Sequence, residues 1–334
     1  MTPYAYPTTL LAVDDDPLFL ESLAFRLSPG LRCEGFVRPA EALAELARRA
    51  ACAGGDDLLA PLDPADMCEL PGDVEDRAIR AQLNRIRRLA GNADRMREVS
   101  VVVADYDMPG MDGVQLFRAI RDLPCLKVLL TGKADERVAV AAFNEGLIDR
   151  FVPKHDATAP ATLRDLLDEA AERYFQRRTR TLGDILRACG SFVLDPDFEA
   201  YFADVKTRRR VTEHYLCTEV PGLLCGTRDG DAFFLLVQDQ EAIVDNRHYA
   251  VRQGAPAEIL AAMQAPDRQL WPEPDPDGSG RINWRLFAAE RVGCDGRLAC
   301  SIIPVPAEFA GFQPGSPSLA RYSRADARLP HSSP

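Results

Sequence analysis

A run of β-branched residues in the first half of the chain most constrains what it can fold into. Val101, Val102 and Val103 form an apolar segment with the length and composition of a strand that is buried on both faces, and this segment ends in Asp105. Turn-forming residues follow, and Asp112 is placed to cap a helix. The segment therefore predicts a parallel α/β sheet with a carboxylate at the carboxyl end of one strand, where such sheets place their sites.

Segments of similar apolar character recur on both sides of this strand and alternate with helical patterns. The other predicted strands are Thr9–Val13, Cys33–Val37, Leu126–Thr131 and Asp149–Val152. The helices predicted between the strands lie near residues 18–27, 39–50, 114–120 and 134–146. Five strands that alternate with helices predict a doubly wound, five-stranded parallel sheet with right-handed crossovers.

The alternation is interrupted between residues 51 and 98 by a segment that we interpret as an insertion. Connections of this kind usually have about two to six residues. The first part of the insertion is rich in Pro, Gly and acidic residues. The second part, Val74–Ala90, has the spacing of a helix with one apolar face, which consists of Ile79, Leu83, Ile86 and Leu89. Asp73 is in position to cap this helix and Gly91 to end it.

A second domain is predicted after a long helix. The helical pattern extends from Thr162 to Cys189 and fits two alternatives, a coil that joins two chains in a homodimer and a connector within one chain. The following residues predict a smaller α+β domain with an antiparallel sheet, whose strands lie near residues 213–217, 223–227, 232–237, 284–289 and 298–305. The predicted division is a first domain over 1–158, a connecting helix over 159–190, a second domain over 191–313 and a disordered tail over 314–334.

The charge and the cysteine content disfavour several classes of function. The net charge is −11 and both halves of the chain are net acidic, which disfavours a nucleic-acid-binding surface. The nine cysteines include no C-x-x-C pair, so neither a zinc site nor a disulfide framework is predicted. No apolar run approaches the roughly 20 residues of a membrane helix. We therefore expect a cytoplasmic protein with reduced thiols and without a membrane partner.

Polar residues follow four of the predicted strands, at the ends that share one edge of the sheet. They are Asp14 and Asp15, Asp105, Thr131 and Lys154. Crowded carboxylates repel one another unless a cation neutralises them, and Mg²⁺ is the hard cation that suits carboxylates together with a phosphoryl oxygen. Lys154 and Thr131 can bind phosphoryl oxygens. This set of residues predicts phosphoryl transfer to Asp105, since carboxylates accept phosphoryl groups as acyl phosphates.

Four short motifs occur in order along residues 8–156 and carry a resemblance to a known family. They are Leu11–Pro17 (LAVDDDP), Asp105–Gly113 (DYDMPGMDG), Leu130–Gly132 (LTG) and Phe151–Lys154 (FVPK). Together they resemble the receiver domain of bacterial two-component response regulators, which has a flavodoxin-like fold. The insertion is similar to a helical excursion found in one subgroup of receivers.

The resemblance implies a phosphoacceptor site that requires Mg²⁺. It makes Asp105 the phosphoacceptor, and it makes Thr131 and Lys154 residues that contact the phosphoryl group. The metal ligands that it implies are Asp14, Asp15, Asp105 and the backbone carbonyl of Asp107. The implied phosphoryl donor is a histidine kinase or a histidine phosphotransfer protein.

The resemblance also implies a switch that acts on the second domain. Phe151 fills the position of the family's switch aromatic residue. In the family a proline usually follows the lysine, whereas here Pro153 precedes Lys154. A protein- or ligand-binding output domain is the first interpretation of the second half. A DNA-binding transcriptional output and an enzymatic output are the alternatives. Apart from the receiver's own phosphorylation and dephosphorylation, we expect no enzymatic activity.

Overall fold

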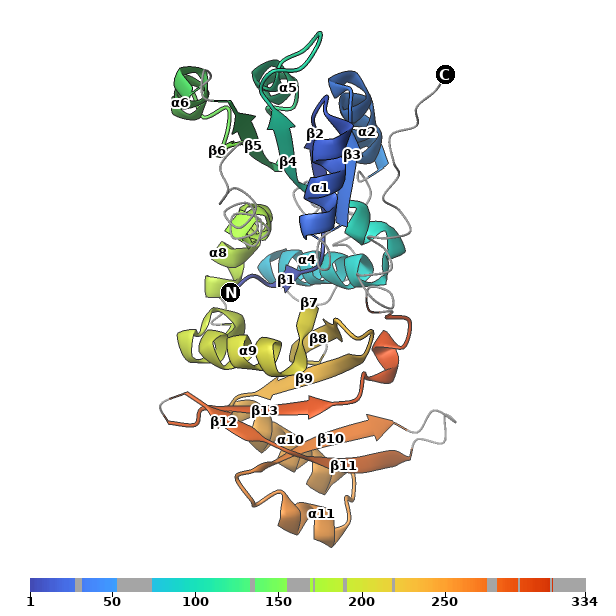
Figure 1. Ribbon diagram of the computed structural model, residues 1–334. Helices are drawn as coiled ribbons and strands as arrows, with labels where there is room; N and C mark the ends of the chain where they lie inside the picture. The colour runs from blue at the N-terminus through green and yellow to red at the C-terminus, as the bar shows by residue number, and fades with distance from the viewer. Residues whose placement is uncertain are drawn as a thin grey trace.

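The computed structural model contains two large sheets that are stacked along the long axis of the molecule (Figure 1). The residues that it describes are 1–27, 32–52, 74–132, 136–154, 169–170, 172–188, 191–217, 220–274, 281–293, 295–312 and 314. Most of the predicted tail and the first part of the insertion lie outside these residues. Among the described helices, none combines the length and the apolar character that crossing a membrane requires.

The first half of the chain forms the predicted five-stranded parallel sheet. Its strands are β2 (Thr9–Val13), β3 (Arg32–Phe36), β4 (Val99–Asp105), β5 (Leu126–Thr131) and β6 (Arg150–Pro153). Their order is β3-β2-β4-β5-β6, and all four neighbouring pairs are parallel. This is the doubly wound, flavodoxin-like order, so the predicted fold class of the first half is confirmed.

Helices cover this sheet and begin where the sequence predicts. They are α1 (Pro17–Leu27), α2 (Pro39–Cys52), α5 (Gly113–Ala119) and α6 (Glu136–Asn144). Asp112 caps α5 as predicted, because its carboxylate accepts the backbone N–H of Gln115 at 2.7 Å while the Gln115 side chain accepts the N–H of Asp112. Leu116 and Phe117 of α5 are fully buried against the sheet.

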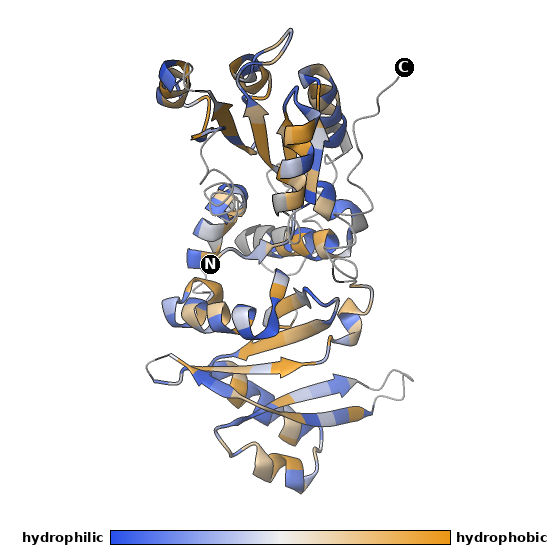
Figure 2. Cartoon of the chain, viewed as in Figure 1, coloured by the Kyte–Doolittle hydropathy of each residue, from blue (hydrophilic) through white to orange (hydrophobic). Residues whose placement is uncertain are grey.

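The second large sheet is antiparallel and has the order β1-β7-β8-β9-β13-β12. Its strands are β1 (Tyr4–Ala5), β7 (Val211–Cys217), β8 (Gly222–Thr227), β9 (Ala232–Gln238), β12 (Glu290–Val292) and β13 (Leu298–Ile303). The helical segments of this half are η3 (Phe192–Leu194), α9 (Pro196–Arg209), α10 (Gln240–Arg252), α11 (Ala257–Ala262) and η4 (Ala307–Phe309). The central strands of both sheets are predominantly hydrophobic (Figure 2). The prediction of an antiparallel α+β second half is thus confirmed.

Three strands were not predicted from the sequence. Strand β10 (Arg268–Pro274) pairs with β11 (Ile282–Ala288) in a separate two-stranded sheet, although it contains Pro272 and Pro274. A two-stranded sheet consists only of edge strands, where proline is tolerated. Strand β12 is very short, and β1 consists of two residues far from its partner β7 in the sequence.

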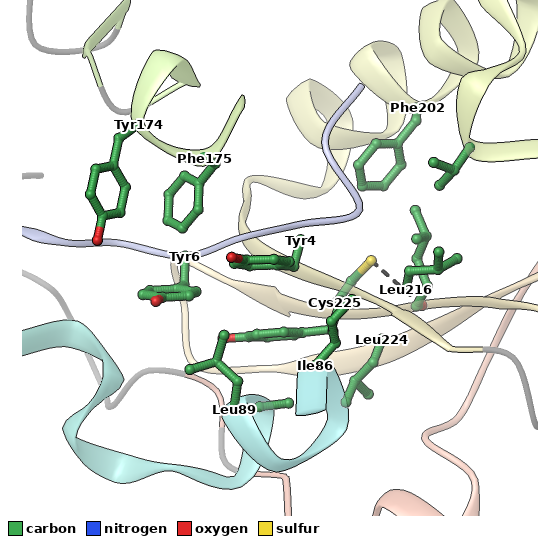
Figure 3. Close-up of a cluster of buried hydrophobic side chains, with 14 of the residues drawn as sticks. Tyr4, Tyr6, Ile86, Leu89, Tyr174, Phe175, Phe202, Leu216, Leu224 and Cys225 are labelled. Carbon is green, nitrogen blue, oxygen red and sulfur yellow. Dashed lines mark hydrogen bonds between the residues drawn. The ribbon is translucent and has the colours of Figure 1, made fainter. Parts of the chain in front are cut away.

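The insertion helix lies between the two large sheets. This helix, α4 (Val74–Gly91), buries Leu83, Ile86 and Leu89 in a core that also contains residues of β1 and β7. Figure 3 shows Tyr6 of the N-terminal segment between Phe175 on one side and Leu89 on the other. The rings of Tyr6 and Phe175 meet edge to face, with centroids 4.9 Å apart. The predicted amphipathic helix is confirmed, and its apolar face joins the two halves of the molecule.

The predicted long helix is present wherever the structure describes it, with one break. Residues 172–178 are helical, Thr179 is in a turn, and α8 (Arg180–Ala188) follows. The first residues of the predicted helix, 162–168, lie outside the described part of the chain. The helix over 172–178 contributes Tyr174 and Phe175 to the core between the sheets, as a connector within one chain would.

A second group of contacts between the halves is polar. The carboxylate of Glu98, which directly precedes β4, accepts hydrogen bonds from the hydroxyls of Tyr6 and Tyr174 and pairs with Arg178. Arg95, in η2 (Ala93–Arg97), donates from Nε and Nη2 to Oε2 of Glu213 in β7, at 3.1 and 2.8 Å. We call α4, η2, Glu98 and residues 172–178 the junction.

Candidate functional site

The strand ends of the parallel sheet bring together the residues that the sequence predicted. Asp14 directly follows β2, Asp105 ends β4, Thr131 ends β5 and Lys154 directly follows β6. A ligand oxygen from each of Asp14, Asp15 and Asp105 lies within 4.8 Å of the others. The ends of β2, β4 and β6 thus contribute to one cluster at the carboxyl edge of the sheet, as expected for a doubly wound fold, and Thr131 ends the neighbouring strand β5.

Asp14 is the most deeply buried carboxylate of the cluster, with 1% of its surface exposed. Its Oδ1 accepts the backbone N–H of Asp16 at 2.9 Å, and its Oδ2 lies 2.8 Å from Nζ of Lys154. Burial nevertheless raises the pKa of Asp14 above its ordinary value, because these two partners do not fully compensate for lost hydration. The charge on Asp14 is therefore costly until a further cation approaches.

Lys154 provides a positive charge between two carboxylates. Its Nζ lies 3.0 Å from Oδ2 of Asp105 in addition to its contact with Asp14. Burial alone would lower the pKa of Lys154, but the contacts with Asp14 and Asp105 outweigh burial and raise it. The same Nζ lies 4.8 Å from the ring centroid of Phe19 in α1. Lys154 is thus fixed in its charged form at the centre of the site.

The cluster retains an excess of negative charge that suits a hard cation. In the described part of the chain it combines three carboxylates with the ammonium group of Lys154. Oxygen ligands at this density fit a divalent ion such as Mg²⁺, which uses one or two carboxylates and keeps several waters. Asp15 is exposed, and Asp107 lies in the loop after β4 with an exposed side chain. The donor set thus fits the predicted metal.

Gly113 allows α5 to approach the end of β4 closely. A Cβ atom at this position would lie 2.3 Å from the backbone oxygen of Asp105 and 2.8 Å from Cδ1 of Leu129. Its N–H donates to the carbonyl of Tyr106 at 3.0 Å, which closes the loop that carries Asp107. The sequence predicted a turn here, but the requirement for glycine becomes evident only from this contact.

The last two strands, β5 and β6, contain Thr131 and Phe151, and Lys154 follows β6 directly. Thr131 is 3% exposed and pairs with Pro153 in the sheet. The backbone N–H of Lys154 donates to the carbonyl of Thr131 at 2.9 Å, so the chain continues the ladder after the proline. Phe151 is partly buried and packs against the core on one face of the parallel sheet. The structure therefore places all the predicted site residues on β4, β5, β6 or the loops beside them, except for Asp14 and Asp15, which follow β2.

One residue of the site was not predicted from the sequence. The apolar pattern over residues 18–27 indicates only a buried helix face for Phe19, whose ring faces the ammonium group of Lys154 in the structure. That pattern does not show which polar group the ring meets. The contact also depends on β6, which is distant in the sequence.

The fold of the chain is similar to that of a solved response regulator. No family model matches the sequence, and no curated protein matches it. Among solved structures, the response regulator LqsR of Legionella pneumophila is similar along the whole chain, with 24% identity, coverage of 100% of this chain and 99% of that chain, and a TM-score of 0.70. This comparison shows that the two proteins share their fold in both halves.

Shorter matches include two receiver domains. One is the signal receiver domain of an HD-domain-containing protein from Pseudomonas fluorescens, with 22% identity, coverage of 53% of this chain and 95% of that chain, and a TM-score of 0.36. The other is a response regulator receiver domain protein from Clostridium thermocellum, with 17% identity, coverage of 52% of this chain and 98% of that chain, and a TM-score of 0.33.

Proposed function

We propose that the chain is a two-component response regulator that accepts a phosphoryl group on Asp105. The observation that carries this proposal is the contact of Lys154 with both Asp105 and Asp14, beside the acidic cluster at the strand ends. This set supplies a nucleophile, a binding group for phosphoryl oxygens and ligands for a divalent ion. The fold shared with LqsR supports the same class of protein.

The chemistry is a transfer of one phosphoryl group between two side chains. A carboxylate oxygen of Asp105 forms a bond to phosphorus while the phosphorus–nitrogen bond of the donor's phosphohistidine breaks, and the imidazole nitrogen keeps the electron pair. Lys154 and the hydroxyl of Thr131 bind the phosphoryl oxygens. Mg²⁺, when bound, neutralises charge on the carboxylates and the phosphoryl group. Its proposed ligands are Asp14, Asp15, Asp105 and the backbone carbonyl of Asp107.

Phosphorylation is proposed to switch the second half of the chain. Thr131 moves toward the new charge and Phe151 changes its packing, so the face formed by α6 and β6 shifts. The division proposed is a receiver over residues 1–158, a connecting helix over 159–190 and an output domain over 191–313. We propose a protein- or ligand-binding output, a histidine kinase or phosphotransfer protein as donor, and the cytoplasm as the compartment.

The test is phosphorylation by a small donor. Acetyl phosphate with Mg²⁺ is expected to add one phosphoryl group to the wild type, as measured by intact mass, and none to Asp105→Asn. Asp16→Asn is the matched control, because Asp16 is exposed at the same edge and an Asn retains the acceptor for the N–H of Leu18. Labelling of Asp105→Asn at the wild-type level would refute the assignment.

A further inference from the structure

We propose that Phe19 is a positioning residue for Lys154. The face of the Phe19 ring holds the lysine ammonium beside Asp105 for phosphoryl transfer. This inference rests on the proposed function, because it adds a residue to the same site. The observation that carries it is the distance of 4.8 Å from Nζ of Lys154 to the ring centroid of Phe19. A cation within about 6 Å of an aromatic centroid is attracted by the electron-rich face.

The position of the ring is fixed independently of the lysine. Phe19 lies in the first turn of α1, where the Asp16 carboxylate accepts the N–H of Leu18 at 2.9 Å and the Asp16 carbonyl accepts the N–H of Leu20 at 3.2 Å. The ring is partly buried and packs against the core between the sheets. The helix start fixes the backbone of Phe19, and the packing against the core restrains its ring without a contribution from Lys154.

The lysine needs such a support because its other contacts change during the reaction. Lysine carries a compact charge on a flexible four-carbon stem, and its ammonium is strongly hydrated in water. Here Asp14 and Asp105 attract it from one side, at 2.8 and 3.0 Å. Phosphorylation of Asp105 moves the negative charge that Lys154 faces from the carboxylate to the phosphoryl oxygens. The ring of Phe19 keeps its attraction for the ammonium throughout, because its quadrupole does not depend on the phosphorylation state.

The same helix offers a control for the aromatic residue. Phe25 lies further along α1 and is 80% exposed, whereas Phe19 is partly buried beside the site. A Phe25→Leu variant therefore removes an aromatic ring of α1 without touching Lys154. Phe19→Leu removes the aromatic face and keeps an apolar side chain, and Phe19→Trp keeps an aromatic face.

The first measurement uses the metal-free protein without a phosphoryl donor. The ε-CH₂ protons of Lys154 lie near an aromatic face, so their NMR signal is expected to shift upfield through the ring current. The signal is expected to move downfield in Phe19→Leu and to stay in Phe25→Leu. An unchanged signal in Phe19→Leu would overturn the proposed contact whether or not the protein is phosphorylated.

The second measurement is the rate of phosphorylation by acetyl phosphate with Mg²⁺. We expect Phe19→Leu to be slower by about three- to tenfold, as a partly exposed cation–π contact implies, and Phe19→Trp and Phe25→Leu to stay near the wild-type rate. Fluorinated phenylalanines at position 19, which weaken the ring quadrupole at similar size, are expected to lower the rate stepwise with each fluorine. Equal rates across this series would overturn the positioning role. A wild type that is not labelled at all would refute the proposed function instead, while the NMR contact would stand.

Discussion

The two ends of strand β4 carry polar clusters of opposite character. At the amino end, the Glu98 carboxylate is met by Tyr6, Tyr174 and Arg178, all from other elements of the chain. At the carboxyl end, Asp105 lies in a cluster of three carboxylates beside Lys154. At the amino end the charge of Glu98 is balanced by Arg178 of the same chain. At the carboxyl end the three carboxylates exceed the one ammonium group, so a net negative charge remains. One strand thus joins a structural anchor to a ligand site.

The ion pair of Arg95 and Glu213, near the amino end of β4, is a second example of buried charges that balance each other. Both side chains are almost fully buried, at 3% and 1% exposed, and the Glu213 carboxylate also accepts the hydroxyl of Tyr215 at 2.7 Å. Buried charges are tolerated when they are paired and hydrogen-bonded. The difference between the two ends shows that burial by itself does not define a functional site. The excess of negative charge at the carboxyl end of β4 distinguishes it, because this excess favours the binding of a cation from outside the chain.

Breaking the junction pair is expected to have the largest effect on stability. Arg95→Ala leaves Glu213 buried without its arginine partner, which typically costs about 3–5 kcal/mol. Urea unfolding at pH 7 measures the loss. The double variant Arg95→Leu/Glu213→Leu is expected to lose less than Arg95→Ala, because no buried charge remains. A loss below about 1 kcal/mol for Arg95→Ala would show that the junction does not depend on this pair.

His214, which is next to Glu213 in β7, predicts that the stability depends on pH. Burial lowers the pKa of His214 to about 4, although its ring nitrogen bonds the carbonyl of Thr2 at 3.0 Å. The unfolded chain therefore takes up a proton below its ordinary pKa of about 6.5 while the folded chain does not, and stability falls as the pH drops through this window. Between pH 7 and pH 5 the loss attributed to His214 is about 2 kcal/mol.

Urea unfolding at both pH values tests this expectation. His214→Gln retains a donor for the Thr2 carbonyl but cannot take up the proton, so its loss of stability on acidification is expected to be smaller than that of the wild type. Equal losses in the two proteins would contradict the assignment of the pH dependence to His214.

At the carboxyl end of β4, the close contact between Gly113 and the backbone of Asp105 is expected to contribute more to stability than the charges do. Gly113→Ala forces a Cβ to within 2.3 Å of the Asp105 carbonyl oxygen, so the helix or the strand end shifts, at a cost of about 1–3 kcal/mol. Slower phosphorylation of Asp105 is expected to accompany the loss. Gly91→Ala is the matched control, since a Cβ at Gly91 meets nothing within 4 Å. Similar losses in the two variants would argue against a specific clash.

The smallest expected change in stability is a gain, whereas the other variants lose stability. Asp14→Asn keeps an acceptor for the N–H of Asp16 and removes a charge that burial disfavours, so we expect the metal-free protein to become slightly more stable at pH 7. Stabilisation by added Mg²⁺, measured as a rise in Tm, is expected to be lost. A destabilisation as large as that of Arg95→Ala would mean that both ends of β4 are structural anchors.

The sequence predicted the first sheet well because the information there is local. Each strand and helix of the parallel sheet has its own apolar pattern, and the right-handed crossover rule then places the strand ends at one edge. Asp14, Asp105 and Lys154 could therefore be brought together without any knowledge of side-chain contacts. The apolar face of α4, from Leu83 to Leu89, could also be predicted from its local pattern.

The partners of that face were not predictable from local patterns. α4 packs against β7, and the N-terminal Tyr4–Ala5 strand is too short to produce a periodicity. The pairing of Arg95 with Glu213 joins residues 118 positions apart, and neither side chain differs in type from a surface residue. The ring of Phe19 and the space required at Gly113 likewise depend on how separate elements approach one another. These features follow from tertiary packing.

The pairing of β1 with β7 has a consequence for the order in which the chain can fold during synthesis. Thr2 and His214, which are joined by a hydrogen bond, are 212 positions apart in the sequence. At about 5–20 residues per second, a ribosome needs roughly 10–40 s to synthesise this length. The parallel sheet can form within that interval, while Tyr4 and Tyr6 still lack β7. The antiparallel sheet is thus completed only when β1, which is synthesised first, pairs with β7, which is synthesised much later. The two halves therefore reach their final structure at the same stage.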